Sequence, residues 1–431
     1  MNQAGSLLTG ADCGLNDWLA WLETLSPSEI VLGLERVTKV LDRLQPARPD
    51  RVIHVAGTNG KGSCVAMLEA LFISTGECVG AYTSPHIHQY NERIRIDAAP
   101  VSDAEIISAF ERVEEARQDL PLTYFEFGAL AAILIFESHK TDTVILEVGM
   151  GGRLDAVNAI EPDAGIITNV SLDHCDWLGE DIESIASEKA GIMRGDKPFV
   201  FGSKNIAESI LTQAEKLGTD LHQLGRDFDF TIDSASRDTW AWSGRRMSLA
   251  PLEMPALAGK IQLQNAAAVL ALIEAMHLDY LLDNELINAA FARLELAGRC
   301  QLIETDRTWL FDVAHNAEAA GVLSEQLAEM PVGGKKIAII GMLSDKDQTG
   351  IVSPLREQIN TWIAVTADGN RALPARKLAA GIANLCGKPC LVSENLPGAM
   401  RYAHDHSSAD DLILVTGSFY VVGPALKWLV L

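Results

Sequence analysis

The ten residues HVAGTNGKGS, 54–63, combine glycines with a lysine at the point where an apolar run ends. The strict nucleotide-binding loop has the form G-x-x-x-x-G-K-[ST]. This stretch departs from it, because its first two glycines lie three residues apart and Gly62 follows Lys61. The physical requirements of a phosphate site remain, since glycines admit backbone N–H groups, a lysine adds charge and a helix N-terminus adds its positive dipole. The stretch therefore predicts a nucleotide phosphate site; the alternative is a glycine-rich turn with an exposed lysine.

Other polar residues fall at the ends of runs that are typical of strands. Ser84 ends CVGAYTS, Glu147 lies near the end of TVILEVG, and Asp173 and His174 follow AGIITNV. Ligands of open α/β sheets bind outside the carboxyl ends of the strands, so we expect these side chains beside the phosphate site. Hydroxyl, carboxylate and imidazole groups with phosphate oxygens would form a magnesium shell, although histidine is an uncommon magnesium ligand. Taken singly, each residue also fits a structural role in a turn, an ion pair or a loop.

Apolar runs alternate with helix-period segments, which indicates an α/β fold with a mainly parallel sheet. The helix after the phosphate loop places four apolar residues on one face, namely Val65, Leu68, Leu71 and Phe72. The expected strands cover 51–56, 78–84, 143–149, 164–170 and 198–203, and the expected helices cover 102–118, 123–139 and 181–194.

The pattern changes after residue 225, where short alternating runs predict an antiparallel appendage. Helices are expected at 261–276 and 284–294, followed by a second series of strands at 308–314, 335–341, 361–368 and 411–417. We place the domain boundary near Ala297–Gly298. This predicts a larger α/β domain over 1–297, which contains the phosphate loop, and a smaller Rossmann-like α/β domain over 298–431.

The charge balance limits the partners. Lys and Arg number 35 against 58 Asp and Glu, a formal net charge of −23, which disfavours nucleic acid and anionic membranes. Seven scattered cysteines argue against a disulfide framework and for the cytoplasm, and we expect Cys386 and Cys390 to be structural. The longest apolar stretch, 129–136, is far shorter than the ~20 residues of a membrane span. The N-terminal residues show no signal-peptide pattern.

Seven blocks of the sequence match the pattern of one known family. They are GTNGKGS (57–63), TSPHIHQYNERIRI (83–96), LTYFEFGALAA (122–132), LEVGMGGRLDAVN (146–158), TNVSLDHCDWLG (168–179), EKAGIMR (188–194) and FDVAHNAEAA (311–320). Together they resemble folylpolyglutamate synthases of the Mur-ligase superfamily, most of all the bifunctional bacterial dihydrofolate synthase/folylpolyglutamate synthases. The resemblance implies a Mur-ligase-like monomer in which MgATP phosphorylates a carboxylate and the amine of L-glutamate attacks the acyl phosphate. It implies dihydropteroate and reduced folates as the acids.

The resemblance also assigns nucleotide and metal residues. It places the ATP phosphates at Gly57, Thr58, Asn59, Gly60, Lys61, Gly62 and Ser63, and further nucleotide contacts at Asn265, Arg299 and Asp312. Its magnesium ligands match Ser84, Glu147 and His174. Lys189 matches a lysine that CO₂ carbamylates, which gives a carboxylate near a second magnesium ion. The residues alone predict an ordinary surface lysine at that position.

By the same resemblance, the acid would lie near Gly33, Leu34, Thr123, Tyr124, Phe125, Glu126, Leu154, Asp155 and Ala156. Residues 124–126 also fit the first turn of a buried helix. His315 and Ser418 match positions implicated in glutamate binding or turnover, and with Lys61, Lys189 and Asp312 they are the expected catalytic residues. Ala317 stands where the family often has proline; since alanine also starts helices, we expect only a local effect.

Three other functions remain open. The nearest is a monofunctional folylpolyglutamate synthase, which lacks the dihydropteroate reaction. A switch ATPase would respond to nucleotide and form no amide. A muramyl-type ligase is a third alternative, against which the blocks at 83–96 and 122–132 count, because they resemble folate enzymes.

Overall fold

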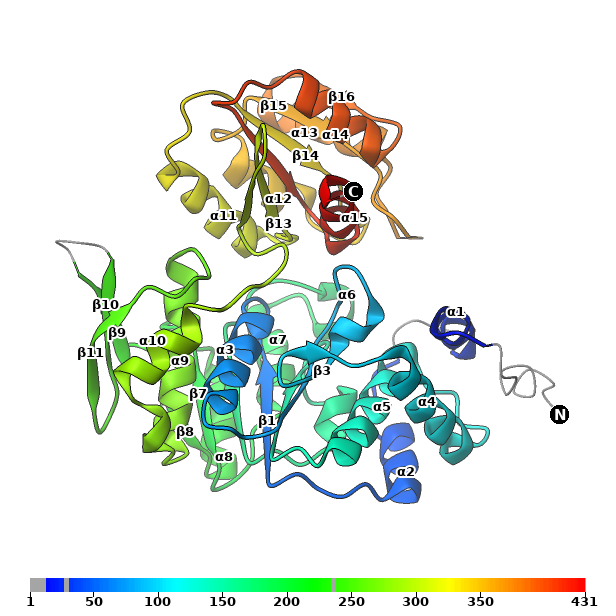
Figure 1. Cartoon of the computed structure of the whole chain (residues 1–431), viewed down its shortest axis with the longest axis vertical. Coiled ribbons are helices and arrows are strands. Elements are labelled where there is room, and N and C mark those ends of the chain that lie inside the picture. The colour runs from blue at the N-terminus through cyan, green and yellow to red at the C-terminus, as the bar shows by residue number, and fades with distance from the viewer. Residues whose placement is uncertain (1–12, 27–30, 234–237, 370, 431) are drawn as a thin grey trace.

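The computed structural model describes residues 13–26, 31–233, 238–369 and 371–430. These residues form two α/β bodies, with the blue-to-green N-terminal body below the yellow-to-red C-terminal body in Figure 1. The segment 1–12, which the sequence predicts not to be a signal peptide, lies outside the described residues. None of the described helices is both long enough and apolar enough to cross a membrane.

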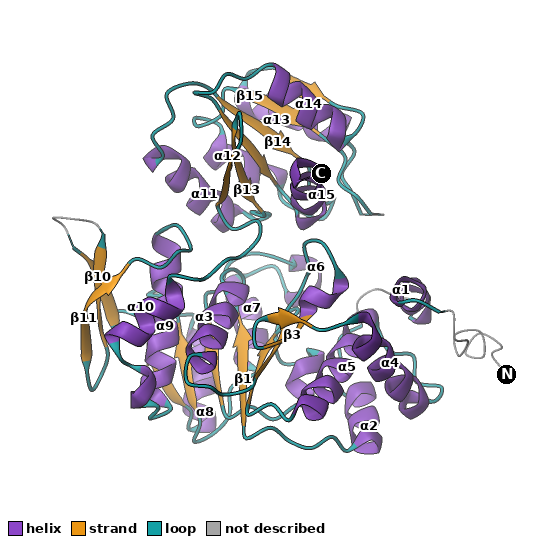
Figure 2. Ribbon diagram, viewed as in Figure 1, coloured by secondary structure: helices purple, strands orange, loops and turns teal. Residues whose placement is uncertain are grey.

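An eight-stranded sheet forms the centre of the lower body (Figure 2). Its strands are β1 (Arg51–Ala56), β2 (Val79–Tyr82), β3 (Ile94–Ile96), β4 (Ala99–Pro100), β5 (Thr143–Glu147), β6 (Ala164–Ile167), β7 (Pro198–Phe201) and β8 (Asp220–Gln223). The order is β4-β3-β2-β5-β1-β6-β7-β8, and neighbours are parallel except at β2–β3 and β3–β4. The five predicted strands are present, each ending at or before its predicted end.

Helices cover both faces of this sheet, so its strands are apolar on both sides. Along β1, Val52 and Ala56 join one core while Ile53 and Val55 join the other, which is the period of two of a strand. The first core includes α1 (Leu15–Leu25), α2 (Glu35–Leu44), α4 (Asp103–Arg117), α5 (Tyr124–His139), α7 (Ile182–Ala190) and α8 (Glu208–Leu217). The second includes α3 (Lys61–Ile73), α9 (Lys260–Ala275) and α10 (Asn284–Phe291).

Three helices differ from the sequence prediction, one of them α10, which ends at Phe291 and not at residue 294. The predicted apolar face of α3 is buried, but Cys64 and Met67 are also fully buried, because α9 and α10 pack against this helix. The helix predicted at 181–194 is shorter: in α7, Asp181 accepts a hydrogen bond from Ser184 N at the start, and the helix ends before Gly191. A Cβ at Gly191 would overlap Arg153, so the close approach of the two segments at this helix end requires glycine.

The predicted antiparallel appendage is confirmed. Strands β9 (Asp229–Ile232), β10 (Thr239–Ser243) and β11 (Ser248–Glu253) form a three-stranded antiparallel sheet. Trp240 and Trp242 of β10 are buried, and Trp242 Nε1 donates to Ala267 O of α9 at 3.1 Å. The appendage is therefore part of the core that covers the outer side of α3 and α9.

The upper body contains a six-stranded sheet in the order β12-β13-β17-β14-β15-β16, parallel except at β12–β13. The strands are β12 (Gln301–Glu304), β13 (Thr308–Asp312), β14 (Lys336–Ile340), β15 (Thr361–Ala364), β16 (Cys390–Val392) and β17 (Leu412–Thr416). The helices are α11 (Ala317–Glu329), α12 (Gln348–Leu355), α13 (Ala375–Cys386), α14 (Leu396–Asp405) and α15 (Phe419–Val430). The predicted α/β class is confirmed in both bodies. The boundary near Ala297–Gly298 falls between α10 and β12 and stays a prediction.

Candidate active site

A cavity of about 1360 Å³ lies between the two bodies. Strands β2, β5, β1 and β6 are neighbours in the lower sheet, so the segments that follow them meet at one edge. The structure thus brings together the phosphate loop, Ser84, Glu147 and His174, all of which line the cavity.

Every site residue proposed from the sequence lines this cavity except Gly33 and Leu34. Gly33 N instead donates to Leu154 O at 3.3 Å, and Leu34 is the N-terminal cap of α2. Their neighbours Val31 and Leu32 form the cavity wall. The hydrogen bond to Leu154 holds the Gly33 backbone away from the cavity, and Val31 and Leu32 line the cavity instead.

The phosphate loop requires glycine at two positions. Gly57 and Gly60 have φ values of +144° and +86°, and a Cβ at Gly60 would lie 2.6 Å from Asn265 Oδ1. A Cβ at Gly57 would overlap the Thr168 hydroxyl. Helix α3 begins at Lys61, whose Nζ donates to the Gly57 and Thr58 carbonyls at 3.1 and 3.2 Å. The lysine therefore folds back over the loop at a helix N-terminus, as a phosphate site needs.

The segment after β6 fixes the loop from its other side. Asn169 Oδ1 accepts from Thr58 N at 3.2 Å and from Asn59 N at 2.9 Å. Thr168 Oγ1 donates to Asn59 O at 2.6 Å. No role for Asn169 is predicted from the sequence, although this residue lies inside the TNVSLDH block that carries the family resemblance.

The three proposed magnesium ligands fit a divalent cation chemically. Glu147 is 5% exposed; burial raises its pKa, while the nearby Lys61 opposes that rise. Its Oε2 accepts from Ser84 N at 3.1 Å, which places Ser84 beside the carboxylate. Burial lowers the pKa of His174 to about 4, so its imidazole is neutral and available as a ligand. Among the described residues no cluster of three or more His, Cys, Asp or Glu marks a metal site, which suits Mg²⁺, since this ion takes few protein ligands together with water and substrate phosphates.

Lys189 is not the surface residue that its sequence context indicates. It is 4% exposed at the end of α7, where α7 faces the cavity. Burial, with Lys61 nearby, lowers its pKa to about 7. Within the described residues its amine has no hydrogen bond or ion pair. A substantial fraction of this amine is thus uncharged at neutral pH.

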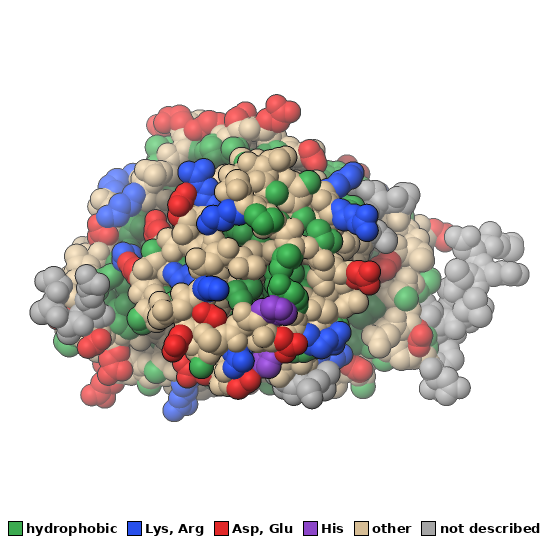
Figure 3. All heavy atoms as spheres, turned by 90° about the horizontal axis from the view of Figure 1, so that it is seen from above, with side chains coloured by type: hydrophobic (Ala, Val, Ile, Leu, Met, Phe, Trp, Pro, Cys, Tyr) green, Lys and Arg blue, Asp and Glu red, His purple; other side chains and the backbone are tan. Residues whose placement is uncertain are grey.

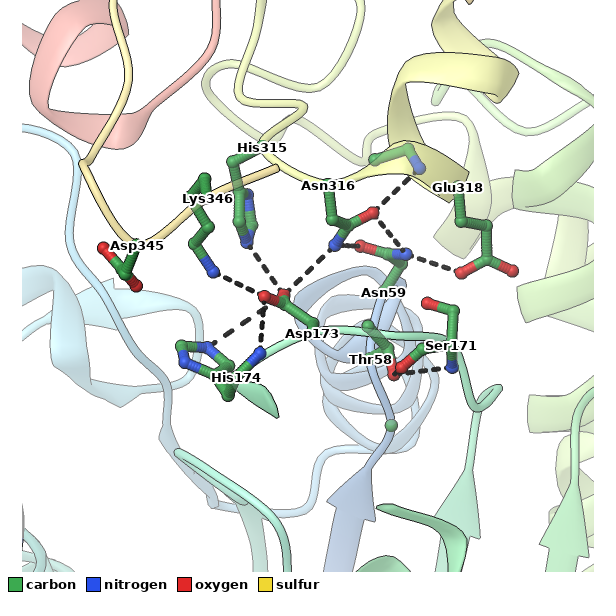
Figure 4. A network of polar contacts seen from close by, with 12 residues as sticks. Thr58, Asn59, Ser171, Asp173, His174, His315, Asn316, Glu318, Asp345 and Lys346 are labelled. Carbon is green, nitrogen blue, oxygen red and sulfur yellow. Dashed lines mark hydrogen bonds and ion pairs between the residues drawn. The ribbon is translucent and has the colours of Figure 1, made fainter. Parts of the chain in front are cut away.

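Asp173 joins the two bodies across the cavity (Figure 4). Its carboxylate lies 2.5 Å from Lys346 Nζ, 3.2 Å from Asn316 Nδ2 and 3.6 Å from His315 Nε2, all in the upper body. Burial would raise the pKa of Asp173, but the hydrogen bond with His315 and the charges around it hold the pKa well below its usual range. The sequence placed Asp173 at this edge, but only the structure reveals its partners.

The phosphate loop itself is bound by the upper body (Figure 4). Asn59 Nδ2 donates to Asn316 Oδ1 at 3.2 Å and to Glu318 Oε2 at 2.6 Å, and Asn316 Nδ2 donates back to Asn59 Oδ1 at 2.9 Å. Glu318 also accepts from Asn169 Nδ2 at 3.0 Å. Sequence reasoning missed Asn316, Glu318 and Lys346; the first two lie in the FDVAHNAEAA block, beside the assigned His315. Helix α11 begins at Ala317, so alanine is accommodated where the family often has proline, and the expectation of a merely local effect stays a prediction.

The other upper-body residues also have structural partners. Arg299 lies over the Phe419 ring at 5.3 Å. Asp312 accepts from Cys300 N at 2.9 Å and from Ala314 N at 2.8 Å. Ser418 Oγ accepts from Tyr420 N at 3.2 Å, at the start of α15.

The proposed acid pocket is built on helix caps. Thr123 and Glu126 form a capping box for α5, and Arg36 pairs with Glu126 at 2.7 Å. Asp155 caps η3 (Ala156–Ala159) and accepts from Met150 N at 2.9 Å and Val157 N at 3.1 Å. Burial raises the pKa of Asp155 to about 7, against the hydrogen bonds that lower it. The Phe125 ring lies 5.6 Å from the Tyr82 ring and adds apolar surface to the cavity lining.

Comparison with known proteins agrees with this geometry. A model of the Mur ligase middle domain matches residues 55–273, and one of the Mur ligase glutamate ligase domain matches 298–419. The chain is 37% identical over 414 residues to the dihydrofolate synthase/folylpolyglutamate synthase of Escherichia coli, covering 96% of this chain and 95% of that protein. The chain belongs to the dihydrofolate synthase/folylpolyglutamate synthase family of Mur ligases.

Solved structures of this family superpose closely. An Escherichia coli FolC structure in complex with DHPP and ADP has a TM-score of 0.91 at 36% identity, covering 97% of this chain and 98% of that one. A bifunctional folylpolyglutamate synthase/dihydrofolate synthase with Mn, AMPPNP and L-glutamate bound has a TM-score of 0.90 at 38% identity, covering 98% and 100%. The protein is therefore an ATP-dependent ligase that uses a divalent metal, and the family assignment predicted from the sequence is confirmed. The switch-ATPase and muramyl-ligase alternatives are thereby rejected.

Proposed function

We propose that this protein is a bifunctional ligase that joins L-glutamate to dihydropteroate and to reduced folates, each through an acyl phosphate. The bifunctional names of its relatives favour this activity over a monofunctional folylpolyglutamate synthase. The observation that carries the proposal is one cavity lined by the phosphate loop, the buried Glu147 carboxylate, the partly exposed His174 imidazole and side chains of both bodies. One centre serves both acids, because each reaction activates a carboxylate and adds the same amine.

The first half-reaction is the transfer of the γ-phosphoryl group to the acid. The loop amides and Lys61 orient the phosphates, and Arg299 and Asp312 contact the nucleotide from the upper body. Ser84, Glu147 and His174 would hold magnesium, which neutralises charge on the transferring group. The carboxylate oxygen bonds to phosphorus and ADP departs. The amine of glutamate then attacks the acyl carbon, loses a proton and expels phosphate.

Lys189 is proposed to be carbamylated. Its uncharged fraction at neutral pH supplies a nitrogen lone pair to the carbon of CO₂, and the amine loses one proton as the carbamate forms. The resulting carboxylate would hold a second magnesium ion. Lys189→Ala should be inactive and partly rescued by a small carboxylate. The native mass should show one added CO₂, and an unmodified Lys189 in active, CO₂-equilibrated enzyme would disprove this assignment.

The proposed partners are small molecules only, with the enzyme acting as a cytoplasmic monomer. The net charge of −23 disfavours nucleic acid. On the face shown in Figure 3, acidic and basic side chains are interspersed and do not form a single basic surface. All seven cysteines are free thiols, in keeping with a reducing compartment.

The deciding assay supplies MgATP and labelled glutamate with either acid alone and follows amide formation. Product with both dihydropteroate and tetrahydrofolate is expected. Product with tetrahydrofolate alone would leave a monofunctional enzyme, and product with neither would reject the folate assignment. Phe125→Ala should reduce the dihydropteroate reaction more than folate extension, because its ring lies in the proposed pterin pocket. Asp155→Asn should do the same.

A further inference from the structure

Arg93 is an arginine of the cavity to which the proposed reaction gives no role. It ends η2 (Tyr90–Arg93), and its half-buried side chain lines the cavity wall in the lower body. Among the described residues no Asp or Glu forms an ion pair with it. By contrast, Arg95, two residues on, pairs with Glu69 at 2.8 Å, and Arg36 pairs with Glu126 at 2.7 Å.

Neutral groups hold the guanidinium in place. Arg93 Nε donates to His86 Nδ1 at 2.9 Å, and its central carbon lies 5.4 Å from the ring centroids of both Tyr90 and Tyr124. Because His86 Nδ1 accepts this bond, the proton of the neutral ring is on Nε2. Burial and the charge of Arg93 lower the pKa of His86 to about 4, so the imidazole is neutral at pH 7. Arg93 is therefore the only cation of this pair that an anion could bind.

A half-buried cation with only neutral neighbours is suited to an anionic ligand. Burying a charge costs free energy unless a counter-ion and hydrogen bonds offset it. The guanidinium has five N–H groups, of which the Nε–H is taken by His86. Its two terminal nitrogens form the planar fork that binds a carboxylate through two parallel hydrogen bonds. The Tyr90 and Tyr124 rings, whose centroids are 5.6 Å apart, lie on the same side of the guanidinium and restrict its orientation.

The position of Arg93 indicates which carboxylate it binds. The carboxylate that becomes phosphorylated must lie beside Lys61 and Glu147, where the phosphate loop ends. Arg93 instead belongs to a segment that packs on the upper body, because Ile87 joins the apolar core of that body and a Cβ at Gly423 of α15 would overlap Ile87 O. Tyr420 follows Ser418 by two residues at the start of α15, on the side of the cavity proposed for glutamate.

We propose that Arg93 binds a carboxylate of the incoming L-glutamate. This assignment rests on the proposed function, and it gives the co-substrate glutamate a binding residue in the lower body. Glutamate presents two carboxylates, neither of which reacts while its amine attacks the acyl phosphate. Binding one of them from the lower body and the rest from the upper body orients the amine across the cavity. Since both reactions consume glutamate, Arg93 serves both.

The test measures initial rates against glutamate concentration with each acid in turn. Arg93→Gln should raise the KM for glutamate roughly 10- to 100-fold with both acids, because a charge-assisted bidentate contact is lost. The KM values for ATP and for the acids should stay within about threefold of the wild-type values, because the contacts with these substrates are kept. Arg112→Gln is the matched control: its exposed side chain pairs with Glu137 at 3.1 Å, away from the cavity, and its kinetics should be those of the wild type.

Analogues of glutamate separate a binding role from a packing role. L-Glutamine lacks the γ-carboxylate and isoglutamine lacks the α-carboxylate. The wild type should discriminate against both analogues, and Arg93→Gln should lose the discrimination against one of them by the same factor as its rise in KM. A substitution that merely disturbs packing would lower all three rates in parallel.

Several outcomes would overturn the assignment. An unchanged KM for glutamate in Arg93→Gln would do so. A loss confined to folate extension would assign Arg93 to the α-carboxylate of the folate acceptor instead. If Arg93→Gln does not fold, Arg93→Lys keeps the charge against Tyr90 and Tyr124 and removes the fork, and the same measurements decide. Amide formation by the wild type is the prior condition, so its absence would reject the proposed function and not this role of Arg93.

Discussion

Replacing Asp173 with asparagine should weaken the connection between the two bodies. The substitution keeps the shape of the side chain but removes the charge that faces Lys346, whose side chain is only 7% exposed. The buried ammonium is then left without its counter-ion. Removing one partner of a buried ion pair costs about 3–5 kcal/mol. At about 1.4 kcal/mol per factor of ten, the arrangement seen in Figure 4 should become less populated by roughly 100- to 4,000-fold.

The free energy of unfolding in urea and the radius of gyration in solution would measure this effect. A second substitution, Lys346→Met, removes the stranded charge, so the double variant should lose less stability than the sum of the two single variants. Asp345→Asn is the matched control, because Asp345 and Arg371 form a 3.8 Å pair that is 25% and 40% exposed, worth at most about 1 kcal/mol. Wild-type stability of Asp173→Asn, or strictly additive losses in the double variant, would refute the argument that this pair joins the bodies.

Three further outcomes are expected. Lys61→Ala should fold normally and lose on the order of 10²-fold or more in turnover, because a positioned cation of the phosphate site is removed; near wild-type rates would reject the role of the loop. A chain ending at Ala297 should keep the phosphate loop but form no amide, since Arg299, Asp312 and His315 are then absent; full ligase activity would contradict the two-body site. His54 is 0% exposed, and burial lowers its pKa to about 3, so below about pH 6.5 the unfolded chain binds a proton that the folded chain does not. As pH falls below that value, protonation of His54 in the unfolded chain should lower the free energy of unfolding by about 1.4 kcal/mol per pH unit, until the pH approaches the folded pKa. His54→Phe should abolish this contribution, which urea titrations at several pH values would measure.

The amino-acid sequence determined the elements and the chemistry at their ends. Short continuous apolar runs predicted the central strands, and helix-period segments predicted α4, α5 and α9 nearly to the residue, because these signals depend only on near neighbours in the chain. Parallel strands align their carboxyl ends, so Ser84, Glu147 and His174 were expected at one edge before any coordinates. The family resemblance supplied the reaction and the roles of Lys189 and Arg299.

Tertiary structure decided whatever depends on residues far apart in the chain. Lys189 has the local sequence of a surface helix, and only the packing of α7 toward the cavity buries its amine and lowers its pKa. Glu126 is bound by Arg36, 90 positions away, and Asn59 by Glu318, 259 positions away. No local period encodes such pairs, because they exist only once the sheet order is set and the upper body lies over the phosphate loop. That arrangement also leaves Arg93 facing the cavity without a carboxylate partner among the described residues.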